Sequence, residues 1–199
     1  MKPLFLLDVD GVICDIISAI CAYVNKYYES QEEPRRIYSG NFTEYRFEDC
    51  PELTTHDVNI IGQYLAHTSH IEMRPYPGAD KFVDNLLQMG DVAVVTTPWP
   101  PNKRWAEWRK LWLITHFREL AEKTIFTCDK SAVAGDILIE DCVGNASVWT
   151  RANPNGTALL LERPWNVGAK KAPPWATFFS PSYDDLLRKV ELLSRSGRE

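Results

Sequence analysis

The sequence lacks several features that would assign a protein to a class at once. Its five cysteines are odd in number and have no CxxC spacing, which argues against a disulfide framework or a zinc site and favours free thiols in a reducing compartment. No apolar run approaches the roughly 18 residues that a membrane-spanning helix needs. The apolar start is interrupted by Asp8 and Asp10, so it does not resemble a signal peptide. We therefore expect a cytoplasmic protein without a membrane partner.

The sequence also has no surplus of positive charge. It carries 22 basic and 27 acidic residues, and its net charge of -5 comes entirely from residues 15–74, which hold ten acidic and five basic side chains. An acidic chain is a poor binder of long nucleic acids, because such binding depends on neutralising phosphates with Lys and Arg. Tryptophan is absent before Trp99, although eight Phe and Tyr residues lie in 15–74. This asymmetry predicts two parts, residues 15–74 and residues 1–14 with 75–199.

What is present is an alternation of apolar β runs with helical patterns. Together with 45% hydrophobic residues, it predicts an α/β fold, with a Rossmann-like parallel sheet as core and helices on both faces. The predicted strands are 4–9, 92–95, 124–127, 137–139 and 158–161. The predicted helices are 13–28, 55–66, 79–89, 102–120 and 182–193.

Polar side chains follow four of these strands. Asp8 and Asp10 end the first strand, Thr96 ends the second, Lys130 follows the third and Asp141 follows the fourth. Each alone is typical of a turn or a helix cap, but the carboxyl ends of parallel strands meet at one edge of a sheet, where ligands bind. Carboxylates suit Mg²⁺, a hydroxyl and an ammonium can hold phosphate oxygens, and an aspartate can attack phosphorus. The set predicts phosphoryl chemistry.

Four ordered motifs carry a resemblance. They are Asp8-Val9-Asp10-Gly11-Val12, the strand Val92–Thr96, Lys130, and Gly135–Asp141 (GDILIED). The chain resembles the haloacid dehalogenase-like superfamily of aspartate-dependent phosphatases.

A closer resemblance is to the 5'(3')-deoxyribonucleotidase family. It rests on residues 8–15 (DVDGVICD), 96–98 (TTP), 130–131 (KS), 136–141 (DILIED) and 74–79 (RPYPGA).

The resemblance implies a role for each motif residue. Asp8 would be the nucleophile, and Asp10 would be the general acid and then the general base. Asp8, Asp141 and Asp10, the last through its backbone carbonyl, would bind Mg²⁺. Thr96, Thr97 and Lys130 would hold the phosphoryl group. The resemblance also implies a small helical cap inserted after the first strand, at residues 15–74.

Two positions depart from the family's pattern. Glu140 stands where most of the family has Asp. We expect this change to modify the site without abolishing its function, because the metal ligand Asp141 is retained. Ile16 stands where the family often has an aromatic residue, which leaves the nucleotide preference open.

Aromatic residues are the candidates for substrate contacts. Phe42, Tyr45, Arg46, Trp99 and Lys103 are the candidates for positions that approach the substrate. The favoured alternative is that most cap aromatics pack the cap's own core and that Arg46 pairs with Glu44 or Glu48 on the surface.

The predicted partner is a small phosphorylated substrate, a nucleoside monophosphate. A homodimer, a sugar phosphate substrate and a catalytically silent binding protein on the same scaffold are left open. The same resemblance predicts Mg²⁺ as cofactor.

Overall fold

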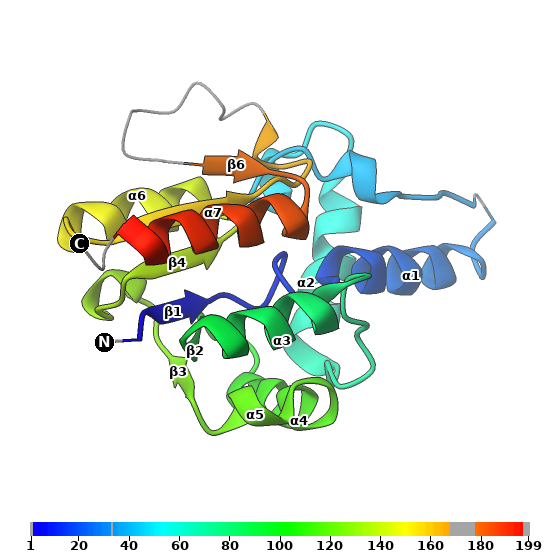
Figure 1. Ribbon diagram of the computed structural model, residues 1–199. Helices are drawn as coiled ribbons and strands as arrows, with labels where there is room; N and C mark the ends of the chain where they lie inside the picture. Colours follow the sequence, from blue (N-terminus) through cyan, green and yellow to red (C-terminus); the bar gives the residue numbers. More distant parts are fainter. Residues whose placement is uncertain (1, 33, 168–177, 197–199) are drawn as a thin grey trace.

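The computed structural model describes residues 2–32, 34–167 and 178–196. Its centre is a six-stranded sheet in which every pair of neighbouring strands is parallel, in the order β3-β2-β1-β4-β5-β6 (Figure 1). The strands are β1 (Leu4–Leu7), β2 (Asp91–Thr96), β3 (Thr124–Phe126), β4 (Ile137–Glu140), β5 (Thr157–Leu161) and β6 (Phe178–Ser180). The predicted α/β fold with a parallel sheet is confirmed.

Helices lie on both faces of this sheet. The α-helices are α1 (Ile16–Tyr28), α2 (Thr55–His67), α3 (Ala79–Met89), α4 (Trp105–His116), α5 (Arg118–Ala121), α6 (Val143–Ala152) and α7 (Tyr183–Ser196). Three short 3-10 turns are η1 (Ser39–Asn41), η2 (Phe47–Asp49) and η3 (Lys130–Ala132). In Figure 1, α3 and α7 lie in front of the sheet and α6 lies behind it. No helix among the described residues is long and apolar enough to cross a membrane.

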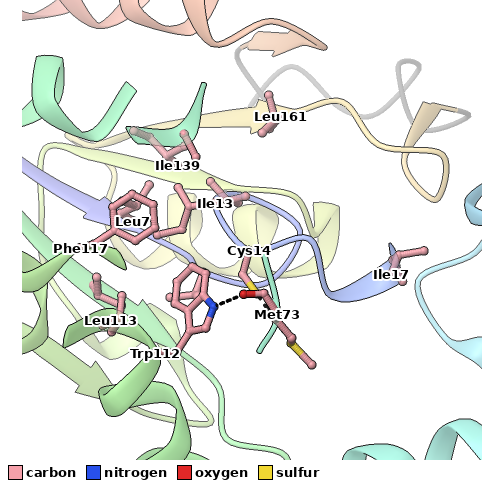
Figure 2. Close-up of a cluster of buried hydrophobic side chains, with 14 of the residues drawn as sticks. Leu7, Ile13, Cys14, Ile17, Met73, Trp112, Leu113, Phe117, Ile139 and Leu161 are labelled. Carbon is pink, nitrogen blue, oxygen red and sulfur yellow. Dashed lines mark hydrogen bonds between the residues drawn. The ribbon is translucent and has the colours of Figure 1, made fainter. Parts of the chain in front are cut away.

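The alternation of side chains along β1 explains why both faces are covered. Phe5 and Leu7 belong to a large buried cluster with side chains from α1, α3, α4 and α7, whereas Leu6 belongs to a second cluster with Trp149 of α6. Successive side chains of a strand point to opposite faces. Figure 2 shows the first cluster beside the turn that follows β1, where the indole of Trp112 donates a hydrogen bond to the Met73 carbonyl at 2.7 Å.

The predicted start of the first helix is wrong. The structure places a tight turn at residues 9–14, in which the Cys14 N–H bonds the Val9 carbonyl at 2.8 Å, and Gly11 takes a φ of 79°. Asp15 then caps α1 by accepting from the Ser18 N–H at 3.0 Å. The helix predicted over 102–120 is two helices, α4 and α5, and neither α6 nor β6 was predicted.

Residues 15–74 form the part with α1, η1, η2 and α2, and all six strands lie outside it. Their apolar side chains do not form a separate core, because Ile20, Phe42 and Ile61 belong to the same cluster as Leu7 of the sheet. The division into a catalytic core and a cap stays a prediction.

A buried carboxylate joins the two helices of this segment. Asp57 of α2 accepts from the Tyr28 hydroxyl at 2.8 Å, from Arg35 Nε at 3.1 Å and from the Thr54 N–H at 2.7 Å. Burial alone would raise the pKa of Asp57, but the hydrogen bonds from Thr54 and Tyr28 and the charge of Arg35 outweigh it and lower the pKa.

This network predicts a pH-dependent stability. We expect Asp57→Ala to lower the free energy of unfolding by about 2 kcal/mol at pH 7, because it removes a helix cap and buried hydrogen-bond acceptors. Since the pKa of Asp57 is lower in the folded chain, its contribution is complete above the unfolded value of about 3.9 and declines as pH falls through the folded value. Urea unfolding at pH 7 and pH 3 measures the loss of unfolding free energy in Asp57→Ala, with exposed Asp84→Ala as control. A loss of the same size at both pH values would contradict the prediction.

Candidate active site

Four strand ends bring the predicted site residues to one edge of the sheet. Asp8 directly follows β1, Thr96 ends β2, Lys130 begins η3 after β3, and Asp141 directly follows β4. All four side chains are buried, and all four residues line one cavity of about 540 Å³. The sheet topology explains this convergence, because β2, β1 and β4 are neighbours and β3 pairs with β2.

Lys130 lies between two carboxylates. Its Nζ is 2.8 Å from Asp8 Oδ1 and 3.0 Å from Glu140 Oε1. The Glu140 carboxylate also accepts from Asn145 Nδ2 at 2.5 Å and from the Asp141 N–H at 3.0 Å. Burial alone would raise the pKa of Glu140, but the charge of Lys130 and hydrogen bonds from the side chains of Asp8, Asn145 and Lys130 hold it at about 2. Glu140 is therefore an anion that fixes the ammonium group beside Asp8.

The negative charge of this cluster exceeds the single ammonium. Burial and the charge of Glu140 raise the pKa of both Asp8 and Asp141 well above its usual range, although Lys130 opposes the shift. Asp8, Glu140 and Asp141 each offer a carboxylate oxygen, and these oxygens lie within 4.8 Å of one another. The donor set is the hard oxygen set that Mg²⁺ prefers.

The loop after β5 holds Asp141 by hydrogen bonds. The indole of Trp165 donates to Asp141 Oδ2 at 2.9 Å, and the amide of Asn166 donates to the Asp141 carbonyl at 2.8 Å. Arg163 Nε donates to the Gly11 carbonyl at 2.6 Å, so the same loop also supports the turn after β1. Sequence reasoning did not single out Arg163, Trp165 or Asn166.

Gly11 is required where this turn passes Asp141. Its φ of 79° lies in the left-handed region, and a Cβ added there would collide with the Asp141 carboxylate. We expect Gly11→Ala to lower the free energy of unfolding by about 2 kcal/mol or more, because the backbone strain alone is worth about 1–2 kcal/mol, and to displace Asp141.

Gly62→Ala is the matched control for this change. Gly62 lies within α2 with no atom near its added Cβ, so alanine there is expected to stabilise the chain by about 0.5–1 kcal/mol. Chemical denaturation measures both variants. Equal stability of Gly11→Ala and the wild type would contradict the assignment of strain to this turn.

Asp10 lies at the edge of the same cavity and is partly open to it. Its side chain keeps 23% exposure, and its Oδ1 is paired with Arg109 Nη2 of α4 at 2.5 Å. Burial raises the pKa of Asp10, and the charge of Arg109 opposes that rise. A raised pKa is the direction of shift that a proton donor needs. Arg109 was not predicted from the sequence.

The structure tests the proximity of the predicted substrate contacts. Phe42, Tyr45, Arg46 and Trp99 line the cavity together with Thr97, whereas the exposed Lys103 is not among its lining residues. Arg46 also lies 3.8 Å from Glu48, one of the two partners named in the alternative interpretation, and 3.7 Å from Asp49, which was not named.

Apolar and aromatic side chains also line this cavity. Phe42 packs edge-on against Phe47, with ring centroids 5.8 Å apart, and both line the cavity with Trp99, Trp105 and Leu65. The volume lies within the range of small-molecule sites, about 300–1,000 Å³. The cavity therefore combines a cluster of charged groups with an apolar and aromatic lining.

Comparison with known proteins decides the family. The family model described as "5' nucleotidase, deoxy (Pyrimidine), cytosolic type C protein" matches residues 2–179, which is most of the chain. The chain belongs to this family. It is accordingly a nucleotidase-family hydrolase of the phosphatase type, and the predicted kinship with 5'(3')-deoxyribonucleotidases is confirmed.

Individual relatives agree with this placement. A Bordetella bronchiseptica protein provisionally named as a 5'(3')-deoxyribonucleotidase is 29% identical over 165 residues, which cover 82% of this chain and 85% of that protein. The 5'(3')-deoxyribonucleotidase of Bacillus subtilis is 23% identical over 168 residues, covering 83% of this chain and 88% of its own.

Solved structures share the haloacid dehalogenase-like fold. A provisionally named hydrolase of Bacillus subtilis, crystallised with magnesium, has a TM-score of 0.61 at 15% identity, and the match covers 94% of this chain and 97% of that one. A haloacid dehalogenase-family hydrolase of Deinococcus radiodurans, with bound phosphate and sodium, has a TM-score of 0.63 at 14% identity, with 96% of each chain covered.

Proposed function

We propose that this chain is a Mg²⁺-dependent phosphomonoester hydrolase that dephosphorylates deoxyribonucleoside monophosphates through a phosphoryl group carried on Asp8. The observation that carries the proposal is the position of Asp8, which lies against Lys130 in a cavity that aromatic side chains also line. Family membership and the names of the relatives support the nucleotide as substrate. The cytosolic location in the family's description supports a cytoplasmic enzyme.

In the first step, an Asp8 oxygen attacks phosphorus and the ester P–O bond breaks. Lys130 and Thr96 hold the phosphoryl oxygens, since both are buried at the same edge of the sheet as Asp8. Thr97 lines the same cavity and adds a hydroxyl donor. Positive charge and donors placed where phosphoryl oxygens lie are the main source of catalysis in such transfers.

Asp10 moves the protons in this proposal. It gives its proton to the leaving oxygen as the ester bond breaks, and it then takes a proton from water, whose oxygen attacks the phosphoryl group and frees Asp8. The raised pKa of Asp10 supports the first role, because an acid must hold its proton near the working pH.

The carboxylates of Asp8 and Asp141, with the Asp10 backbone carbonyl, are the proposed Mg²⁺ ligands. Glu140 also belongs to the cluster of possible ligands, but its carboxylate is already bonded by Lys130, Asn145 and the Asp141 N–H. The cation would offset the excess negative charge of the site and draw charge from the phosphoryl oxygens. A magnesium-bound structure of the same fold supports this assignment.

The substrate is tested with purified protein and a panel of phosphomonoesters at equal Mg²⁺. We expect deoxyribonucleoside monophosphates to give a higher kcat/KM than sugar phosphates that lack a base, because aromatic side chains in the cavity can stack on a base by roughly 1–3 kcal/mol. The names of the family and the relatives are the ground for expecting them to exceed ribonucleotides as well. A chelator should abolish turnover and added Mg²⁺ restore it. Equal kcat/KM for sugar phosphates would overturn the substrate assignment, and no turnover of any ester would favour a silent binding protein.

A further inference from the structure

A buried arginine from outside the predicted motifs pairs with Asp10, the proposed general acid. Arg109 of α4 is 1% exposed, and its Nη2 pairs with Asp10 Oδ1 while its Nη1 donates to Cys14 Sγ at 3.3 Å. Asp10 is 99 positions away in the sequence, so the contact exists only in the folded chain. The side chain thus ties the middle of α4 to the turn that carries the acid.

The turn after β1 presents both acceptors to one guanidinium. The Gly11 N–H bonds the Cys14 carbonyl at 3.1 Å, which brings Asp10 and Cys14 into a bridge. Burial raises the pKa of the Cys14 thiol to about 12, so the sulfur is neutral at ordinary pH and accepts from Arg109. The guanidinium fork therefore fixes the Asp10 carboxylate relative to its own backbone turn.

Aromatic rings fix the guanidinium in turn. The Arg109 Cζ lies 5.3 Å from the ring centroid of Trp105 and 5.4 Å from that of Trp112, which are one turn before and after it on α4. Trp112 is itself anchored to the Met73 carbonyl (Figure 2). A planar cation beside two indoles has little freedom to rotate.

The position of Arg109 excludes a direct role in substrate binding. Asp10 and Trp105 line the cavity, whereas Arg109 is not among the lining residues. Its Nε has no hydrogen-bond partner among the described residues. A buried charge with one unpaired donor is weak evidence that the side chain serves to stabilise the fold. Its role is therefore sought in the carboxylate that it holds, that of Asp10.

We propose that Arg109 is a positioning residue that holds one oxygen of Asp10, so that the other oxygen carries the proton to the leaving group. This inference rests on the proposed function, because it assigns Arg109 to the acid of that reaction. Lysine cannot replace it, since an ammonium is a point charge without the fork that reaches both Asp10 and Cys14.

The test compares two esters that differ in their need for an acid. The leaving oxygen of a deoxyribonucleoside 5'-monophosphate is a strongly basic alkoxide, whereas that of p-nitrophenyl phosphate is a stable phenoxide. The parameter is kcat/KM, because it reports the steps up to loss of the leaving group. We expect Arg109→Lys and Arg109→Gln to lower kcat/KM for the nucleotide by about 10²-fold, and for the aryl ester by less than about 5-fold.

Two further variants separate positioning from folding. Arg188 pairs with Asp185 at 2.9 Å on the surface of α7, so Arg188→Lys and Arg188→Gln are matched changes away from the site and should leave both esters unaffected. In an Asp10→Asn background, Arg109→Lys should cause no further loss, because the two residues act as one unit.

Each result has a definite meaning. An equal loss for both esters, or an additional loss in the Asp10→Asn background, would show that Arg109 only maintains the fold and would overturn the inference while leaving the proposed function intact. Full activity of both Arg109 variants would also overturn it. A wild-type protein that hydrolyses neither ester would overturn the proposed function itself, and the inference with it.

Discussion

Replacing Asp8 by asparagine is expected to abolish phosphatase activity, with a fall in kcat of at least about 10⁴-fold, because an amide cannot form the acyl phosphate. Asn has nearly the shape of Asp, so the cavity should persist. The raised pKa of Asp8 means that its charged form is disfavoured in the metal-free fold, so loss of that charge is not expected to lower the unfolding temperature. Steady-state hydrolysis of an aryl phosphate and thermal unfolding measure the two effects.

The control for Asp8→Asn is Asp84→Asn on the exposed face of α3, which should behave as the wild type. If Asp8→Asn kept more than a small fraction of wild-type turnover, another group would have to be the nucleophile. An inactive protein that is also unfolded would be uninformative by itself, and the thermal measurement identifies that case.

Replacing Lys130 by methionine is expected to lower kcat/KM by about 10³-fold and to destabilise the fold. Lys130 holds the phosphoryl oxygens in the proposed reaction, and loss of one such electrostatic contact is typically worth 10²- to 10³-fold. It also pairs with both Asp8 and Glu140, so its removal leaves the ionised Glu140 buried without its cation, at a cost of about 3–5 kcal/mol. Hydrolysis assays and urea unfolding measure these two losses.

The exposed Lys123→Met serves as the control for the loss of a lysine and should change neither quantity. Because the carboxylates repel one another without Lys130, added Mg²⁺ should recover part of the stability of Lys130→Met. A variant as stable and as active as the wild type would contradict the position of Lys130 as the cation between Asp8 and Glu140.

The part of the site that lies at strand ends could be predicted from the sequence. Apolar β runs are local patterns, and the rule that ligands bind at the carboxyl ends of parallel strands then places Asp8, Thr96, Lys130 and Asp141 together. That prediction required no knowledge of distances between the side chains. Glu140 was noticed only as a departure from the family's pattern, but the structure shows it holding Lys130.

The supporting side chains could not be predicted, because their contacts depend on tertiary packing. Arg109 lies in an amphipathic stretch with Trp105 and Trp112, and its sequence context does not distinguish a buried guanidinium from a surface one. Asn166 reaches Asp141 from a loop 25 residues away, and no periodic pattern marks that loop. The first helix was predicted to begin too early because Ile13 is apolar, but Ile13 packs in the core from a turn.

The most direct test of the account is to trap the phosphoryl group. The variant Asp10→Asn should still accept a phosphoryl group from p-nitrophenyl phosphate, because that leaving group needs no acid, but should release it slowly because the base is gone. After an acid quench and proteolysis, mass spectrometry is expected to find one phosphoryl group on Asp8 and none in the Asp8→Asn/Asp10→Asn variant. A phosphoryl group on a different residue, or wild-type turnover without any phosphorylated Asp8 in the Asp10→Asn protein, would contradict the account.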